Sequence, residues 1–191
     1  TGVTMGILTG PEIRRLAEGG VGANGDQRER IVIRPFDPAK CGPNSYDVHL
    51  GDTFKVYFLV PGGQLPAFDP LSPPKTLEYP IPPEGHVLRP GILYLASTLE
   101  YTETHGLVPR LEGRSSVARG GLKVHLTAGF GDDGFCGHWT LELEVTHPFR
   151  VRAGMKIAQL CYTTLTGERQ PYTGRYQNQG SAPVASKFHE S

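Results

Sequence analysis

The chain has 191 residues, of which 38% are hydrophobic and 20% charged, a composition typical of one folded domain with a sizeable core. Its 19 basic and 19 acidic residues balance, which excludes a protein that coats nucleic acid by bulk charge. No stretch reaches the ~18 apolar residues of a membrane span, and no secretion signal is visible. We expect a cytoplasmic single domain over residues 5–191, with residues 1–4 a cloning remnant before Met5.

The cysteine and histidine pattern argues against a zinc site. Cys41, Cys136 and Cys161 are an odd number without a close pair, so neither a disulfide framework nor a thiolate metal site is indicated. The seven histidines lack the close spacing of metal ligands, and the H-x-E and P-C-x-x-C motifs of zinc deaminases do not occur. We therefore expect no zinc and no metal held by the side chains.

One helix and a series of short strands follow in chain order. In "LTGPEIRRLAEGG", residues 8–20, Thr9 and Glu12 are spaced as a capping box and a glycine pair follows, which predicts a short helix. Brief β-branched and aromatic runs separated by turn residues then predict an antiparallel sandwich, jelly roll or barrel. The predicted strands cover residues 30–34, 46–50, 53–60, 92–97, 123–128, 138–146 and 156–164.

Two segments depart from this strand pattern. Residues 61–90 contain nine of the 17 prolines, so we expect a stiff excursion over the surface that contributes little to the sheet. Its interleaved apolar residues indicate packing against the body and not a proline-rich ligand for another protein. The polar, Gly- and Ser-rich tail at residues 174–191 is typical of a mobile terminus.

The stretch "EGRSSVARGGL", residues 112–122, places Arg114, Ser115, Ser116 and Arg119 close together in a neutral chain. Guanidinium groups fork onto phosphate oxygens, and hydroxyls with glycine amides can fill the remaining directions around a small anion. A solvated turn with ordinary salt bridges is the alternative interpretation of this stretch alone.

The strand predicted at residues 138–146 contains a candidate base. Alternation places Trp139, Leu141 and Leu143 on one face, and Glu142 with its polar neighbours on the other. From the pattern alone, Glu142 is either an exposed glutamate on a wet face or a general base that faces a partly dry pocket.

Four ordered blocks together resemble the dCTP deaminase family of the dUTPase-like superfamily. The blocks are "IVIRPFDPAKCGPNSYDVHLGDTFKVY", "EGRSSVARGGLKVHLTAGFGDDGFCGHWTLEL", "AGMKIAQL" and "PYTGRYQNQ". The resemblance implies a mainly all-β fold, a distorted dUTPase-like β-barrel or jelly roll with a short N-terminal helix. It also implies a homotrimer with active sites shared between subunits, dCTP bound with Mg2+, and deamination without zinc.

The resemblance also assigns roles to individual residues. Glu142 is expected to act as general base, with Ser115 and Arg119 orienting the attacking water. Residues expected to contact the phosphates are Arg114, Ser115, Ser116, Tyr172, Arg175 and Gln179. The base pocket is expected to include Ala128, Thr140 and Leu141, and Asp132 to bind the deoxyribose. Residues 172–191 are expected to fold over bound nucleotide as a lid.

Several functions fit this resemblance. The first is deamination of dCTP to dUTP and ammonia, which supplies dUTP and dUMP for thymidylate synthesis. The second is a bifunctional deaminase and dUTP diphosphatase that releases dUMP and pyrophosphate, favoured by "TAGF" followed by "GFCGHWTLEL". A plain dUTPase lacks support because its glycine-rich carboxyl arm is missing, and a binding-only module would not need Glu142. Feedback inhibition by dTTP is a further expectation.

Four positions depart from the family pattern. Arg175 stands where a lysine is usual, Gly120 replaces an apolar residue, Gly131 a β-branched residue and Asp133 a proline. We expect the two glycines to loosen the pocket wall and to alter substrate preference.

Overall fold

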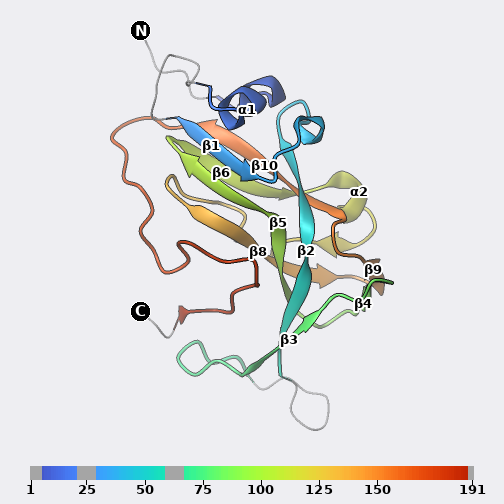
Figure 1. The fold of residues 1–191 in the computed structure, drawn as a ribbon. Coiled ribbons are helices and arrows are strands. Elements are labelled where there is room, and N and C mark those ends of the chain that lie inside the picture. Colours follow the sequence, from blue (N-terminus) through green and yellow to red (C-terminus); the bar gives the residue numbers. More distant parts are fainter. Residues whose placement is uncertain (1–5, 21–28, 59–66, 189–191) are drawn as a thin grey trace.

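The computed structural model describes residues 6–20, 29–58 and 67–188 (Figure 1). The predicted cloning remnant lies outside the described residues, as do Pro61 and Pro66 of the proline-rich segment and the last three residues of the predicted lid. None of the helices in the described ranges is long and apolar enough to cross a membrane.

The described elements are mostly strands. In chain order they are α1 (Gly10–Ala17), β1 (Arg30–Arg34), the 3-10 helix η1 (Pro38–Lys40), β2 (Tyr46–Tyr57), β3 (Thr76–Pro80), β4 (His86–Leu88), β5 (Tyr94–His105), β6 (Leu107–Gly113), α2 (Ser115–Ala118), β7 (Leu122–Lys123), β8 (Cys136–Val145), β9 (Phe149–Val151) and β10 (Lys156–Thr164).

The main sheet has the order β6-β10-β2-β5-β8-β7, with β1 added to β5 and β3 added to β2; β4 and β9 form a separate pair. Every strand pair is antiparallel. The long strands β2 and β5 each change partner along their length at register shifts, which bend them and turn the sheet into a nearly closed barrel. The expected mainly all-β, barrel-like fold with a short N-terminal helix is confirmed.

Burial alternates along β8 as the sequence predicted. Trp139, Leu141, Leu143 and Val145 are buried in the barrel, while the intervening side chains are only half-buried. Apolar side chains of α1 and β10 complete the same core, among them Ile13, Leu16, Leu160 and Tyr162. One face of β8 therefore packs in the core, and the side chains of the other face remain partly accessible.

Three local predictions differ from the structure. Thr9 is the N-cap of α1, but its side chain makes no capping hydrogen bond, and the carboxylate of Glu12 binds Arg15 and does not complete a capping box. The strand predicted at residues 123–128 is limited to the two residues of β7, and the chain beyond leaves the sheet. The proline-rich segment does contribute a strand to the sheet, since β3 pairs with β2. This is possible because β3 has no proline before its last residue, Pro80.

Leu160→Ala tests the barrel core. Leu160 is 0% exposed on β10, so the substitution should lower the free energy of unfolding by about 2–5 kcal/mol, because it removes buried methyl groups and leaves a cavity. Urea unfolding measures this loss. The matched control is Leu71→Ala, at a leucine that is 73% exposed, where we expect a change within about 0.5 kcal/mol. Equal losses in both variants would contradict this assignment of the core.

Candidate active site

A cavity of about 720 Å3 opens beside the half-buried face of β8. Aromatic rings of Phe130, Phe135 and Trp139 contribute to its largely apolar wall. Polar side chains also reach it, namely Asp132, Thr140, Glu142, Tyr172, Tyr176, Gln179 and Ser186. An apolar cavity with a few converging polar groups is the usual form of a small-molecule site.

Glu142 is held in this cavity by the loop that follows β7. Its carboxylate oxygen Oε2 accepts a hydrogen bond from the Leu126 amide at 3.1 Å, and its own amide donates to the Val124 carbonyl at 3.1 Å. The side chain is therefore directed toward the segment that carries Ala128, which also lines the cavity. One cavity is therefore lined by the three residues that were predicted to surround a pyrimidine base, Ala128, Thr140 and Glu142.

The C-terminal tail covers this cavity. The Asn178 amide donates to the Cys136 carbonyl at 2.8 Å, and the His138 amide donates to the Gln179 carbonyl at 3.0 Å, so the tail backbone lies on the start of β8 (Figure 1). The Thr140 hydroxyl donates to Oε1 of Gln179 at 2.7 Å and accepts from the Val184 amide at 3.1 Å. The predicted lid thus lies closed on its own chain, while its ordering by nucleotide stays a prediction.

Two predicted contacts lie away from the cavity wall. The side chain of Leu141 is fully buried in the core on the opposite face of β8, so only its main chain could approach a ligand there. Arg175 is exposed and donates to the carbonyl oxygens of Lys187 and Phe188 at 2.9 and 3.4 Å, which fastens one part of the tail to another. The alternation of side chains along a strand predicts that Leu141 lies on the face of β8 opposite Glu142.

The serine and arginine cluster forms the short helix α2 and lies outside the cavity of its own chain. Ser115, Ser116 and Arg119 are exposed. Arg114 is half-buried, and its Nη1 lies 2.5 Å from Oδ2 of Asp47. None of these four residues is among those that line the described cavity. These hydroxyls and this guanidinium form an exposed group on one helical turn, of the type that binds small anions.

The cavity of a single chain lacks cationic groups. In the part of the chain that the structure describes, its lining has the two carboxylates of Asp132 and Glu142 and no Lys, Arg or His. A triphosphate bound there would face negative charge without a counterion from this chain, which is electrostatically unfavourable. A triphosphate at this position would therefore need positive charge from outside the described lining.

A profile of the family described as dCTP deaminase-like matches residues 7–165. The chain belongs to this family. Relatives named "dCTP deaminase, dUMP-forming" include the protein of Leptospira biflexa, 49% identical over 180 residues that cover 93% of this chain and 94% of the relative. The protein of Cytophaga hutchinsonii with the same name is 48% identical over 155 residues, covering 80% of this chain and 86% of the relative.

A solved structure supports the fold of the family. The 2'-deoxycytidine 5'-triphosphate deaminase from Agrobacterium tumefaciens superimposes with a TM-score of 0.62 at 21% identity, covering 85% of this chain and 49% of that chain. At this identity, the likeness supports the barrel and not a shared activity.

The two glycines that depart from the family pattern make room for aromatic rings. A Cβ on Gly131 would overlap the Trp139 ring, and a Cβ on Gly120 would lie 2.7 Å from Cε2 of Phe149. The Trp139 ring is fixed by its Nε1, which donates to the Thr102 hydroxyl at 3.0 Å. The expectation of a loosened wall is therefore wrong at Gly131, because the space next to that glycine is filled by the indole.

Several cavity residues were missed by the sequence analysis. They come from the ends of β2 and β5, from the proline-rich segment and from the tail: Tyr57, Leu93, Leu95, Phe68, Pro74, Val184, Ala185 and Ser186. Two signals were present: the apolar residues interleaved in the proline-rich segment, which include Phe68, and the apolar "APV" in an otherwise polar tail.

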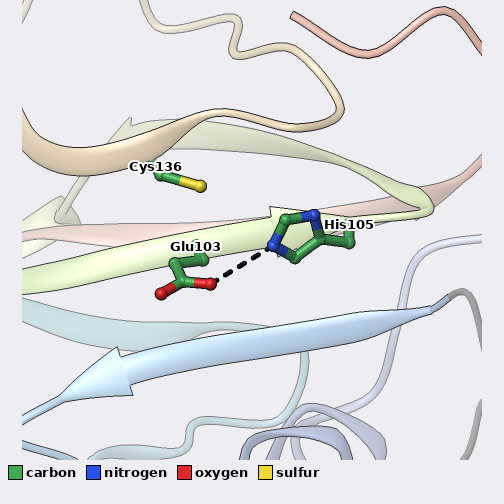
Figure 2. A group of neighbouring side chains, drawn as sticks. All are labelled: Glu103, His105 and Cys136. Atoms are coloured by element: carbon green, nitrogen blue, oxygen red, sulfur yellow. Dashed lines mark hydrogen bonds and ion pairs between the residues drawn. The ribbon is translucent and has the colours of Figure 1, made fainter. Parts of the chain in front are cut away.

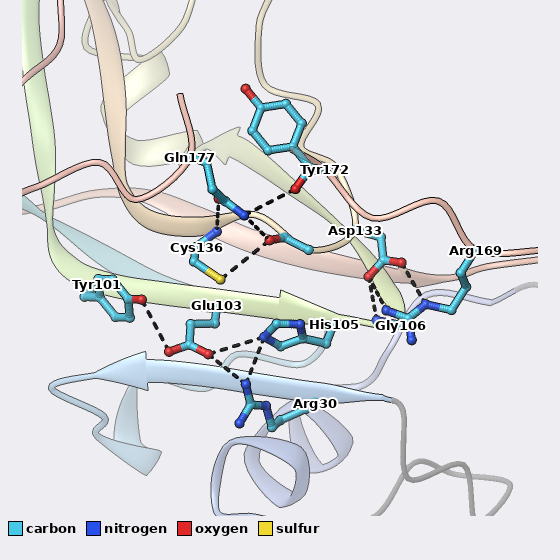
Figure 3. Close-up of polar contacts among 11 residues, drawn as sticks. Arg30, Tyr101, Glu103, His105, Gly106, Asp133, Cys136, Arg169, Tyr172 and Gln177 are labelled. Carbon is cyan, nitrogen blue, oxygen red and sulfur yellow. Dashed lines mark hydrogen bonds and ion pairs between the residues drawn. The ribbon is translucent and has the colours of Figure 1, made fainter. Parts of the chain in front are cut away.

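A second group of polar side chains lies outside the cavity. The possible metal-ligand atoms of Glu103, His105 and Cys136 all lie within 4.8 Å of one another (Figure 2). The spacing of cysteines and histidines in the sequence did not reveal this group, because the pairing of β5 with β8 brings Glu103 opposite Cys136. Cys, His and Glu are a donor set that could hold zinc. However, Nη2 of Arg30 already lies 2.9 Å from the Glu103 carboxylate and 3.0 Å from Nε2 of His105 (Figure 3). The group is therefore satisfied as an ion-pair network.

Gly137→Ala tests how the tail docks. Gly137 has φ 147, and a Cβ there would lie 2.7 Å from the Gln179 nitrogen, so alanine should push the tail backbone away from β8. We expect amide exchange at residues 178–184 to accelerate about tenfold, equivalent to ~1.4 kcal/mol of docking free energy. Hydrogen exchange with mass spectrometry measures this.

Gly154→Ala is the matched control for that experiment. Gly154 also has a positive φ, 74, but a Cβ there would meet nothing within 4 Å, so it carries backbone strain without touching the tail. Tail exchange that is unchanged in Gly137→Ala, or accelerated equally in both variants, would contradict the docking described above.

Proposed function

We propose that this protein hydrolyses dCTP to dUMP in two steps within the cavity beside β8. In the first, water adds at C4 of cytosine, the C4–N bond breaks, and dUTP and ammonia form. In the second, water attacks the α-phosphorus of dUTP, and dUMP and pyrophosphate form. The observation that carries this proposal is the Glu142 carboxylate in an apolar cavity with Thr140 and Ala128 around it, in a chain whose relatives are named as dUMP-forming.

Glu142 is the proposed general base for the deamination. It faces the cavity from the rigid strand β8, and the Leu126 amide fixes the direction of its carboxylate. In that position it would take a proton from the attacking water and pass a proton to the departing ammonia. Asp132, at the cavity rim, has free carboxylate oxygens of the type that accept a hydrogen bond from a sugar hydroxyl.

Mg2+ would accompany the triphosphate. The polar groups in the described cavity lining are carboxylate, amide and hydroxyl groups without a thiolate or imidazole, a donor set that suits a hard ion. Bound mainly by phosphate oxygens and water, the ion would neutralise phosphate charge, and we assign it no protein ligand.

We further propose that three copies of the chain share their active sites. The described cavity lining contains no cationic side chain, whereas Ser115 and Arg119 of α2 are exposed outside it. A neighbouring copy that presented its α2 to this cavity would supply the charge and hydroxyls that the triphosphate needs. A dTTP molecule would fit the same site as a feedback inhibitor.

Product analysis with Glu142→Gln tests the activity. The parent, incubated with dCTP and Mg2+, should yield dUMP, pyrophosphate and ammonia. The variant should lose about 10²- to 10⁴-fold in turnover, because glutamine cannot accept the proton. It should still bind dCTP, as followed by the fluorescence of Trp139, the single tryptophan, which lines the cavity.

Glu144→Gln is the matched control on the same face of β8. Glu144 is not among the residues that line the cavity, and it pairs with Lys123 at 2.9 Å, so this variant should turn over dCTP like the parent. Normal turnover by Glu142→Gln would refute its role as base. Release of dUTP alone by the parent would select the monofunctional deaminase, and no product would select a binding module.

Mixing two inactive variants tests the shared site. Glu142→Gln and Arg119→Ala should each be inactive, and subunit exchange between them should restore about a quarter of the parent activity, because some sites then combine two intact contributions. Activity is measured after mixing under conditions that allow exchange. A mixture that exchanges subunits and stays inactive would place Glu142 and Arg119 in the same site of one chain.

A further inference from the structure

The ion pair between Asp133 and Arg169 lies directly behind the cavity wall. We propose that these two positioning residues, the tail latch, hold the tail closed and keep dUTP in the cavity between the two reactions. This inference rests on the proposed two-step function, and it concerns residues outside the catalytic groups.

Three hydrogen bonds to the Asp133 carboxylate form the latch (Figure 3). Nε of Arg169 donates to Oδ2 of Asp133 at 2.7 Å, and Nη2 donates to Oδ1 at 2.8 Å, a bidentate pair. The Gly106 amide, in the turn between β5 and β6, donates to Oδ1 at 2.7 Å. Asp133 is 6% exposed, so the carboxylate is shielded from competing water and salt.

The same residue joins the cavity wall to the root of the tail. Asp133 follows Asp132, which lines the cavity, and its carbonyl accepts a hydrogen bond from the Tyr172 amide at 2.7 Å. Tyr172 also lines the cavity and comes three residues after Arg169. The side chain and the main chain of Asp133 therefore hold the tail at two points, immediately before it crosses the cavity.

Electrostatics make this contact sensitive to substitution. Burial alone would raise the pKa of Asp133, but hydrogen bonds from Arg169 and Gly106 outweigh it, and the pKa is lowered. The carboxylate is therefore charged at neutral pH and depends on Arg169 for its counterion. Removing either partner breaks this bidentate pair, which weakens the docking of the tail root.

The consequence for the reaction is a change in product. The dUTP formed by deamination either leaves the cavity or is hydrolysed there. A closed tail slows departure, so the intermediate stays long enough for the second step. Because Asp133 itself does not line the cavity, loosening the latch should raise the dUTP share while the deamination step is less affected.

The experiment measures dUTP and dUMP in a single turnover of dCTP, together with amide exchange at residues 170–180. Asp133→Asn and Arg169→Gln should raise both the dUTP to dUMP ratio and the tail exchange by about tenfold, as expected for loss of a charged hydrogen-bonded pair. Arg169→Lys, which keeps one charge, should fall between these variants and the parent.

Arg14→Gln is the matched control. Arg14 pairs with Glu18 at 3.0 Å through side chains that are 54% and 47% exposed, and Arg14 is not among the residues that line the cavity, so its loss should change neither readout. A merely structural role would lower the thermal unfolding midpoint without moving the product ratio. If Asp133→Asn fails to fold, the Arg169→Lys and Arg169→Gln series decides in its place.

Two failures can be told apart. A parent that makes dUMP, with variants that keep its product ratio and tail exchange, would overturn the latch and leave the proposed function standing. A parent that makes no dUMP would refute the two-step function, and unchanged tail exchange in the variants would then overturn the latch as well.

Discussion

The two faces of β8 are the constraint on which the site depends. Leu141, Leu143 and Val145 are buried in the barrel, so the strand cannot rotate or slip without exposing core residues. Thr140 and Glu142 are thereby fixed toward the cavity on the opposite face. The tail backbone hydrogen-bonds the first residues of the same strand, so one element orients the candidate base, a wall of the cavity and its cover.

Sequence reasoning reached the features that depend on short-range periodicity. Alternation identified the outward face of Glu142, and ordered motifs identified the family, both of which the structure and the comparisons support. It could not reach contacts made by sheet pairing or by the tail, because these join residues far apart in sequence. The Glu103, His105 and Cys136 group is one such case, and the pair of Asp133 with Arg169 is another.

Two departures from the family pattern, Gly131 and Asp133, are explained by the side chains that lie next to them in the structure. Gly131 is explained by the Trp139 ring that fills the space next to it, so a residue that suggested a loose wall belongs to a packed one. Asp133, in place of a proline, gains a buried ion pair that no pattern within its own segment could predict. Contacts between residues that are distant in sequence cannot be predicted when each segment is considered separately.

The proposed function requires that the cavity beside β8 binds the pyrimidine end of a deoxynucleoside triphosphate. A crystal structure with a non-hydrolysable dUTP analogue and Mg2+ would locate the bound nucleotide. We expect the pyrimidine ring between Ala128 and Thr140, within hydrogen-bond reach of Glu142, and the phosphates against Ser115 and Arg119 of a neighbouring copy. A nucleotide bound elsewhere, with Glu142 facing only solvent, would contradict it.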